Sequence, residues 1–290
     1  SVKLDLTTMW RARRLGGTLL ILGTSATFAI PLFKFFFPQC VYIVNMAGLE
    51  WSRSKWGNIA RWFLKFNEAI AARFAHSFIT DNQGLSEYIT AEYGRDSVLI
   101  PYGGDQFMRS KVNTNVYHEF TLPAQFDFAM ARAQVDNNME IILDASVSAG
   151  SNLVFVSNWN STSYGKELLA RYGDFQNIRM IGPIYDTEKI KALYLRSRFY
   201  IHGHSAGGTN PVLVESMWAH LPILSYDVLF NRYTTDNSAY YFKTAEELEN
   251  LLGTLGANAN SECANNLFEI ANRKYKWKHI LNAYEAIIFD

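Results

Sequence analysis

The chain has 290 residues, and its 27 Lys and Arg residues equal its 27 Asp and Glu residues. This length is enough for two domains of ordinary size. With 49% hydrophobic and 19% charged residues, the composition is that of a globular protein. It argues against a disordered chain and gives no support to a nucleic-acid-binding protein. The two cysteines, Cys40 and Cys263, lack metal-ligand spacing, which excludes a disulfide scaffold and favours a reduced, intracellular protein.

Residues 18–44 form the first strongly apolar region, but glycine, proline and a lysine, Lys34, interrupt it. A membrane span needs roughly 20 unbroken apolar residues. The region therefore predicts two buried strands, Leu19–Leu22 and Val41–Asn45, around a short helix. No small-residue cleavage site follows a basic start and an apolar stretch, so no signal peptide is evident.

A long helix, Ser54–His76, is predicted next. Its apolar residues at helical spacing are Trp56, Ile59, Phe63, Phe66, Ile70 and Phe74. The strand Ser77–Thr80, the helix Ser86–Tyr93 and the strand Ser97–Pro101 follow. From Gly103 to about Pro123 the sequence is polar and loses periodicity, which indicates a domain junction.

A second series of alternating strands and helices follows the junction. The predicted strands are Phe126–Ala131, Leu153–Val156, Ile178–Ile181, Phe199–Ile201 and Ile223–Tyr226. The predicted helices are Asn138–Ser148, Tyr164–Tyr172, Thr187–Arg196, Pro211–Ala219, Ala245–Leu252 and the C-terminal stretch Asn260–Phe289. Such alternation predicts α/β layers with parallel sheets.

We expect three parts: an N-terminal Rossmann-like domain over 1–112, a C-terminal domain over 113–270 and a helix over 271–290 that returns to the first domain. Only three or four strands precede the junction, and the sequence begins without Met. We therefore expect the N-terminal domain to be incomplete.

The densest group of polar residues follows the strand that ends near His202. A loop with three glycines leads to Asn210-Pro211, which begins a helix. Free backbone N–H groups and the positive end of a helix suit a diphosphate. Glu215, one turn into the helix, could accept hydrogen bonds from two hydroxyls of a ribose or sugar. The alternative is a glycine-rich turn with a satisfied loop histidine, but ligands of open α/β sheets bind at this edge.

The run Gly203–Pro222, followed by Ser225–Asp227, resembles the donor-site signature of family 4 retaining glycosyltransferases, which have the GT-B fold. It is similar in particular to the bacterial rhamnosyltransferase-type branch. Other segments similar to this branch are Asn45–Trp51, Lys55–Gly57, Asp81–Gly84, Tyr102–Gln106 and Asn231–Thr235. The likeness extends from about Thr18 to the C-terminus. It implies two Rossmann-like domains facing a cleft, with the donor in the C-terminal domain.

The resemblance also implies roles for individual residues. Glu215 matches the second of two family glutamates, which holds the nucleotide ribose. Gly207 stands where the first, sugar-contacting glutamate is usual, so His204, Ser205 or backbone amides are left for the sugar. Arg132 matches a family arginine that binds the donor diphosphate.

This sequence also departs from the family pattern. Asn137 or Asn138 stands where the family has a lysine, which reduces the positive charge. The N-terminal Gly-rich loop of the family has no counterpart. Two residues have plainer alternatives, since Arg132 could be a solvated loop charge and Glu50, after a predicted strand, a capping residue.

The candidate site can be stated residue by residue. The candidate catalytic residues are His204, Arg132 and Glu50. The candidate donor-binding residues are Arg132, Asn138, Ser205, Gly207, Gly208, Thr209, Asn210 and Glu215. No metal ligand is predicted, and no cofactor beyond the nucleotide-diphosphate sugar that serves as co-substrate.

The expected function is metal-independent transfer of a hexose with retention of configuration. The resemblance points to L-rhamnose from a dTDP donor and to a surface-polysaccharide or lipid-linked glycan acceptor. Two rivals are a catalytically silent binding or scaffold subunit, and a nucleotide-sugar isomerase on the same fold. The basic or tryptophan side chains of the long helix and the segment before it are Arg53, Lys55, Arg61, Trp62 and Lys65. They suit either a solvated helix face or peripheral contact with the inner face of the plasma membrane, from the cytoplasm.

Overall fold

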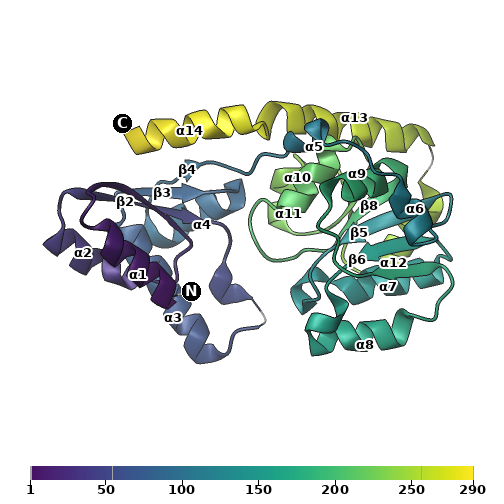
Figure 1. Cartoon of the computed structure of the whole chain (residues 1–290), viewed down its shortest axis with the longest axis horizontal. Coiled ribbons are helices and arrows are strands. Elements are labelled where there is room, and N and C mark those ends of the chain that lie inside the picture. The colour runs from purple at the N-terminus through teal and green to yellow at the C-terminus, as the bar shows by residue number, and fades with distance from the viewer. Residues whose placement is uncertain (1, 54, 256, 290) are drawn as a thin grey trace. The chain divides into compact units, whose positions relative to one another are not determined.

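The computed structural model describes residues 2–53, 55–255 and 257–289, with no side chains described for 257–259. The chain divides into two compact units (Figure 1). Unit 1 comprises Ser1–Pro101, Ala206–Thr209 and Lys278–Asp290, and unit 2 comprises Tyr102–Ser205 and Asn210–Trp277.

Unit 1 contains a four-stranded parallel sheet in the order β1-β2-β3-β4. Its strands are β1 (Gly17–Leu22), β2 (Cys40–Met46), β3 (Ser77–Thr80) and β4 (Val98–Leu99), and its helices are α1 (Val2–Ala12), α2 (Ile30–Phe36), α3 (Asn58–Phe74) and α4 (Gln83–Tyr93). The strand–helix–strand arrangement predicted for residues 18–44 is confirmed. The burial predicted for its first strand is wrong, because β1 is at the edge of the sheet and Leu22 is 73% exposed.

The long helix α3 is present, but the apolar residues at helical spacing do not form its buried face. Ile59 is 86% exposed and Phe66 is 44% exposed. The buried face instead includes Asn67 and Glu68, together with leucine and alanine. These polar side chains are satisfied: Asn67 Oδ1 accepts from the Phe28 N–H at 3.0 Å, and two α4 tyrosines donate to Glu68 at 2.6 and 2.8 Å. Partners on other elements therefore allow polar residues to occupy the buried face.

Unit 2 contains a six-stranded parallel sheet in the order β10-β9-β8-β5-β6-β7. Its strands are β5 (Phe126–Met130), β6 (Leu153–Val156), β7 (Ile178–Ile181), β8 (Ser197–His202), β9 (Ile223–Tyr226) and β10 (Tyr240–Phe242). The five predicted strands are confirmed. The short strand β10 was not predicted, because three residues, two of them half-buried tyrosines, give little apolar pattern from which to recognise a strand.

Helices cover both faces of this sheet, so alternate strand residues face two different cores. One core contains Phe128 and Tyr200 and packs against α9 (Thr187–Arg196), α10 (Pro211–Trp218) and α13 (Ala257–Lys274). The other contains Phe155 and Phe199. Its helices are α7 (Met139–Ser148), α8 (Ser163–Tyr172) and α12 (Ala245–Thr254).

The remaining helices lie between these elements and at the C-terminal end. They are α5 (Gln106–Arg109), α6 (Asn115–Glu119), α11 (Leu229–Thr234) and α14 (Trp277–Phe289), with 3-10 turns η1 (Thr27–Ala29), η2 (Glu50–Ser52), η3 (Val135–Asn137) and η4 (Trp159–Ser161). The predicted C-terminal helix is thus two helices. Within unit 1, the Tyr284 hydroxyl of α14 accepts a hydrogen bond from Asn45 of β2 at 2.5 Å. No helix among the described residues is both long enough and apolar enough to span a membrane.

Candidate functional site

The sheet of unit 2 has a topological switch point between β5 and β8. The chain runs from β5 through β6 to β7 on one side, and then through β8 and β9 to β10 on the other. Loops that leave neighbouring strands in opposite directions open a crevice at the carboxyl edge, where ligands of open α/β sheets bind. The predicted site residues Arg132, Asn138, His204 and Ser205 all lie in the two loops that begin there.

Hydrogen bonds join these two loops directly. The N–H and the hydroxyl of Ser205 both donate to the Asp136 carbonyl, at 2.9 and 2.8 Å. The Asn138 amide donates to the Gly203 carbonyl at 2.9 Å. A Cβ on Gly203 would lie 2.2 Å from the Asn137 carbonyl oxygen, so only glycine permits this close approach.

His204 stacks on His202, with ring centroids 4.5 Å apart and an angle of 17° between the rings. His202 is fully buried, and neither of its ring nitrogens has a hydrogen-bond partner among the described residues. Burial lowers the pKa of His202 well below its usual value, with a further contribution from His204. His202 is therefore neutral at physiological pH, and it gives His204 an uncharged stacking surface.

Arg132 directly follows β5 and its neighbouring Ala131. Its side chain is exposed and makes no hydrogen bond or ion pair with any described residue. Its carbonyl accepts from the Asn137 side chain at 2.7 Å, which fixes the turn of the loop. An unpaired guanidinium is available to bind two phosphate oxygens at once. Both asparagines at the position of the family lysine already donate to backbone carbonyls.

Helix α10 begins as the sequence predicted. The Asn210 side chain accepts from the Val212 N–H at 3.1 Å, and Pro211 takes the first helical position. Burial raises the pKa of Glu215, although a hydrogen bond from Gln106 at 3.1 Å opposes the effect. Gln106 in turn accepts from the Trp277 indole at 2.7 Å. A ribose would therefore compete with Gln106 for this carboxylate.

Three predicted donor residues, Gly207, Gly208 and Thr209, belong to unit 1 by their contacts. The Thr209 hydroxyl donates to the Asp81 carbonyl, and a Cβ on Gly208 would lie 1.8 Å from Asp81 Oδ1. Burial raises the pKa of Asp81 to about 7. Buried carboxyl groups with raised pKa values are frequent at functional sites. The sequence placed Asp81 after a predicted strand, as an acceptor-side or a loop residue, but not among the candidate catalytic or donor-binding residues.

Glu50 also lies in unit 1, where it is paired locally. Its carboxylate is 2.7 Å from Arg53 Nε and 2.7 Å from Lys55 Nζ, and it accepts from the Trp56 indole at 3.1 Å. Burial alone would raise the pKa of Glu50, but the Lys55 hydrogen bond and the two positive charges lower it. The carboxyl group is therefore ionised at neutral pH, which suits charge pairing better than proton donation.

Six of the predicted site residues belong to unit 2. They are Arg132, Asn138, His204, Ser205, Asn210 and Glu215. The other four, Glu50, Gly207, Gly208 and Thr209, belong to unit 1. Among the described residues, no group of three or more His, Cys, Asp and Glu side chains is arranged to hold a metal ion.

Comparison with known proteins gives a partial family match and strong structural likenesses. Residues 21–105 match the family "Domain of unknown function (DUF1972)", and no curated protein sequence matches the chain. Sucrose-phosphate synthase from Thermosynechococcus elongatus superposes with a TM-score of 0.80 at 14% identity, over 97% of this chain and 75% of that protein. HepE from Anabaena, solved with UDP and glucose, superposes with a TM-score of 0.77 at 17% identity, over 98% of this chain and 80% of that protein.

A third solved structure is the pneumococcal O-GlcNAc transferase GtfA in complex with UDP and GlcNAc. It gives a TM-score of 0.68 at 13% identity, over 98% of this chain and 60% of that protein. The chain accordingly has an α/β fold with parallel sheets like that of GT-B glycosyltransferases, as the sequence predicted.

Proposed function

We propose that the chain binds a nucleoside-diphosphate sugar at the switch point of unit 2 and transfers its sugar to an acceptor hydroxyl. The observation that carries this proposal is the unpaired Arg132 guanidinium in the first of two loops that are joined by the Ser205–Asp136 and Asn138–Gly203 hydrogen bonds. The N-terminus of α10, with Glu215 one turn along, begins after the second loop. These are the groups that a diphosphate and a ribose require.

In the proposed reaction, the bond between the anomeric carbon and the phosphate oxygen breaks, and a bond to the acceptor oxygen forms. The bonding electrons leave with the diphosphate, which gains negative charge as it departs, and the proton of the acceptor hydroxyl passes to the departing phosphate oxygen. Arg132 and the positive end of α10 would stabilise that charge, which lowers the barrier to departure. His204 and Ser205 would contact the sugar from the loop after β8.

The identities of the sugar, the donor and the acceptor, and the stereochemistry, are proposed from the resemblance of Gly203–Pro222 to the rhamnosyltransferase-type branch. This resemblance favours an L-rhamnosyl unit, a dTDP donor, retention of configuration and a surface-polysaccharide or lipid-linked glycan acceptor. HepE and GtfA, which share the fold, were solved with UDP, so UDP sugars belong in any test. We further propose that the reaction needs no metal ion.

Turnover assays separate these proposals. The chain would be incubated with dTDP-rhamnose, UDP-glucose and GDP-mannose, with and without EDTA, and nucleoside diphosphate release would be measured. Release from one donor that persists in EDTA supports a metal-independent transferase. Nucleotide binding without turnover under any acceptor would favour the silent subunit, and a rearranged nucleotide sugar would favour the isomerase.

We also propose peripheral contact with a membrane, through the outward face of α3 and not its basic residues. Arg53 and Lys55 both pair with the single carboxylate of Glu50, and Lys65 pairs with Glu68 at 3.2 Å, so these basic side chains are engaged within the protein. The opposite side of α3 exposes Ile59, Trp62 and Phe66 by 86, 68 and 44%. Such aromatic residues favour the lipid headgroup boundary.

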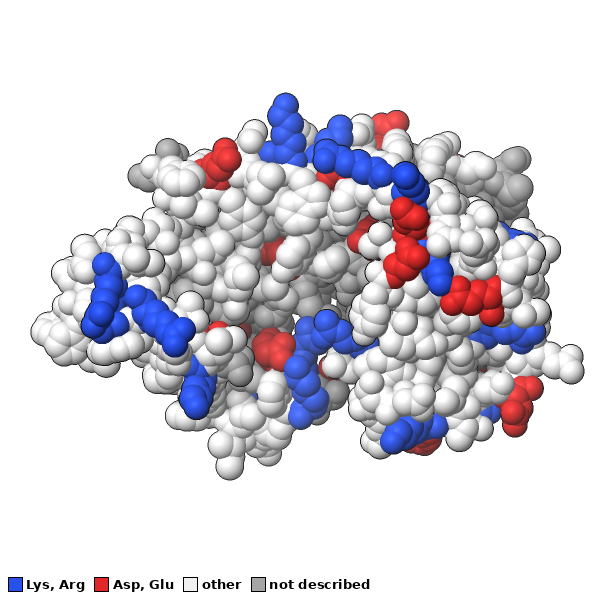
Figure 2. Space-filling view, in the orientation of Figure 1, with Lys and Arg blue, Asp and Glu red and all other residues white. Residues whose placement is uncertain are grey.

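The charge of this region suits an anionic lipid surface. Residues 1–76 contain ten Lys and Arg residues but only three Asp and Glu residues. Figure 2 shows basic side chains among uncharged ones at the left end of the view, where α1 and α2 lie in Figure 1. Positive charge near a membrane surface adds to the apolar contribution.

Co-sedimentation with phosphatidylglycerol vesicles tests this contact. The double variant Trp62→Ser/Phe66→Ser should bind roughly tenfold more weakly than the parent chain. The matched control is Tyr185→Ser, because Tyr185 is 89% exposed in unit 2 and should not affect binding. Equal binding by both variants, or none by the parent chain, would exclude this surface.

A further inference from the structure

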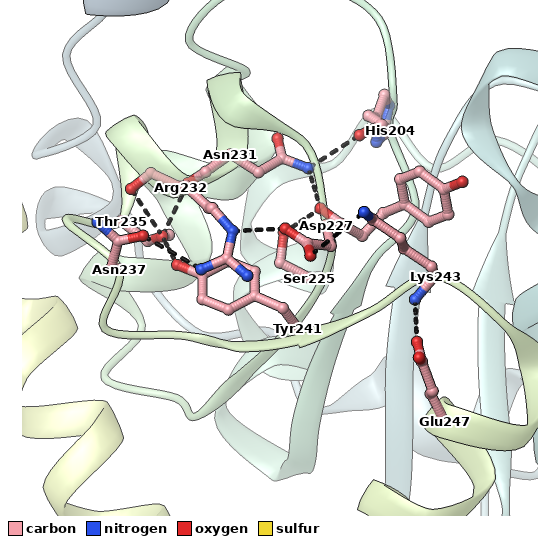
Figure 3. Close-up of polar contacts among 11 residues, drawn as sticks. His204, Ser225, Asp227, Asn231, Arg232, Thr235, Asn237, Tyr241, Lys243 and Glu247 are labelled. Carbon is pink, nitrogen blue, oxygen red and sulfur yellow. Dashed lines mark hydrogen bonds and ion pairs between the residues drawn. The ribbon is translucent and has the colours of Figure 1, made fainter.

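A polar cluster lies at the carboxyl edge of unit 2, around the ends of β9 and β10 (Figure 3). Its central residue is Asn231 of α11, which is 3% exposed. The Asn231 side-chain amide donates two hydrogen bonds of 2.9 Å, one to the His204 carbonyl and one to the Tyr226 carbonyl. One side chain thus joins the loop after β8 to the end of β9.

Neighbouring contacts hold α11 in place. The Arg232 guanidinium pairs with Asp227, donates to Asn237 at 3.2 Å and lies 4.1 Å above the Tyr241 ring. The hydrogen bond from Arg232 lowers the pKa of Asp227, with added contributions from the charges of Arg232 and Lys243. This ion pair therefore persists at neutral pH and anchors the residue that follows Asn231.

The loop after β8 needs such restraint because it contains Gly203, Gly207 and Gly208. Glycine has the largest backbone freedom, so ordering this loop when a ligand binds would cost conformational entropy. Asn231 fixes the His204 carbonyl on one side, and the Asp136 carbonyl holds Ser205 on the other. Two consecutive residues are therefore fixed before any ligand arrives, which reduces that cost.

We infer that Asn231 is a positioning residue that orders the His204–Ser205 segment at the switch point. It acts through the His204 backbone and need not touch a ligand. Its effect on donor affinity rests on the proposed function, but its effect on loop order does not. The segment Asn231–Thr235 was singled out in the sequence without a role, and this contact supplies one.

A residue with the same bonding pattern elsewhere in unit 2 provides a matched control. The Asn177 amide donates to the Ser146 and Ser151 carbonyls, at 3.0 and 2.9 Å, just before β7 begins. This is the amino end of a parallel strand, the edge opposite the candidate site. Asn231→Asp and Asn177→Asp each replace two donated hydrogen bonds by a carboxylate that faces two carbonyls. Asn177 is only half-buried, so the general structural cost should be smaller there than at Asn231.

The experiment is hydrogen–deuterium exchange of the ligand-free protein, followed by dTDP, UDP and GDP calorimetry on the same variants. Asn231→Asp should raise amide exchange over 203–209 roughly tenfold, whereas Asn177→Asp should leave this segment unchanged. If one nucleotide binds, Asn231→Asp should weaken it roughly tenfold, about 1.4 kcal/mol. Asn231→Ser serves as a second variant if Asn231→Asp does not fold.

The outcomes separate this inference from the proposed function. Unchanged exchange over 203–209, or an equal increase in both variants, would overturn the positioning role. If exchange rises only in Asn231→Asp but the parent chain binds no nucleotide, the positioning role stands and the donor-site proposal fails. If the parent chain binds and Asn231→Asp binds equally well despite faster exchange, the inferred link to donor affinity is wrong.

Discussion

Asp81 makes the stability of unit 1 dependent on pH. Its side chain is 2% exposed at the end of β3, and Oδ1 has no hydrogen-bond partner among the described residues. Burial raises its pKa from 3.8 to about 7. The folded state therefore holds this proton more tightly than the unfolded state does. Well below pH 3.8 the carboxyl group is protonated in both states and does not lower the stability. The destabilisation grows as the pH rises and is nearly complete above about pH 7.

The magnitude follows from the shift. A rise of about three pKa units corresponds to about 4 kcal/mol at most, since one unit equals about 1.4 kcal/mol. Roughly 3 kcal/mol of this cost should develop between pH 5 and pH 8, because part of it is already present at pH 5. Asp81→Asn removes the titrating group, so the variant should gain stability relative to the parent chain over this interval.

Urea unfolding at pH 5 and pH 8, followed by circular dichroism, measures this difference. The free energy of unfolding of Asp81→Asn, relative to the parent chain, should rise by roughly 3 kcal/mol from pH 5 to pH 8. Asp96→Asn is the control, because this substitution removes the same charge from an exposed position in the same unit. A difference that is equal at both pH values would refute the assignment of a raised pKa to Asp81.

Three further substitutions test other contacts. Gly203→Ala should lower the free energy of unfolding by about 1–3 kcal/mol, because its Cβ would lie 2.2 Å from a carbonyl oxygen. Gly182→Ala is the control and should be neutral, because no atom lies within 4 Å of the added Cβ. Equal losses in the two variants would contradict the close approach at Gly203. Glu50→Gln should cost less than about 1 kcal/mol at pH 7, since the group is partly exposed. The lowered pKa of Glu50 means that this loss should disappear as the pH falls through the folded-state value, and a loss that persists at pH 2 would contradict the pairing. Lys65→Met should lower the free energy of unfolding in urea by about 2–3 kcal/mol, because it leaves the buried Glu68 carboxylate without its cation. A loss no larger than that of Glu50→Gln would count against the Lys65–Glu68 ion pair.

The sequence predicts the elements of unit 2 well because its strands are buried on both faces. Leu153–Val156, Ile178–Ile181 and Ile223–Tyr226 stand out as short apolar runs between helices, and all three have the predicted bounds. The buried face of α3 was not predictable from periodicity, because Asn67 and Glu68 are buried through partners on other elements. Local patterns do not encode such partners.

The candidate site shows the same division. The loop glycines, Asn210 and Pro211 are local signals, and the structure has a loop and a helix start where they predict them. Gln106 contacts Glu215 across 109 positions of the sequence, and Asn231 contacts His204 across 27. Contacts of this kind depend on how distant elements pack, so only the folded chain reveals them.

Nucleotide binding tests the central proposal most directly. Calorimetry would compare dTDP, UDP and GDP on the parent chain, Arg132→Ala, Glu215→Ala and the control Arg109→Ala, whose side chain is 85% exposed in unit 2. We predict that one nucleotide binds and that Arg132→Ala and Glu215→Ala each weaken it by roughly tenfold, about 1.4 kcal/mol, while Arg109→Ala does not. Failure of the folded parent chain to bind any of the three, or equal effects of Arg132→Ala and Arg109→Ala, would contradict a donor site at the switch point.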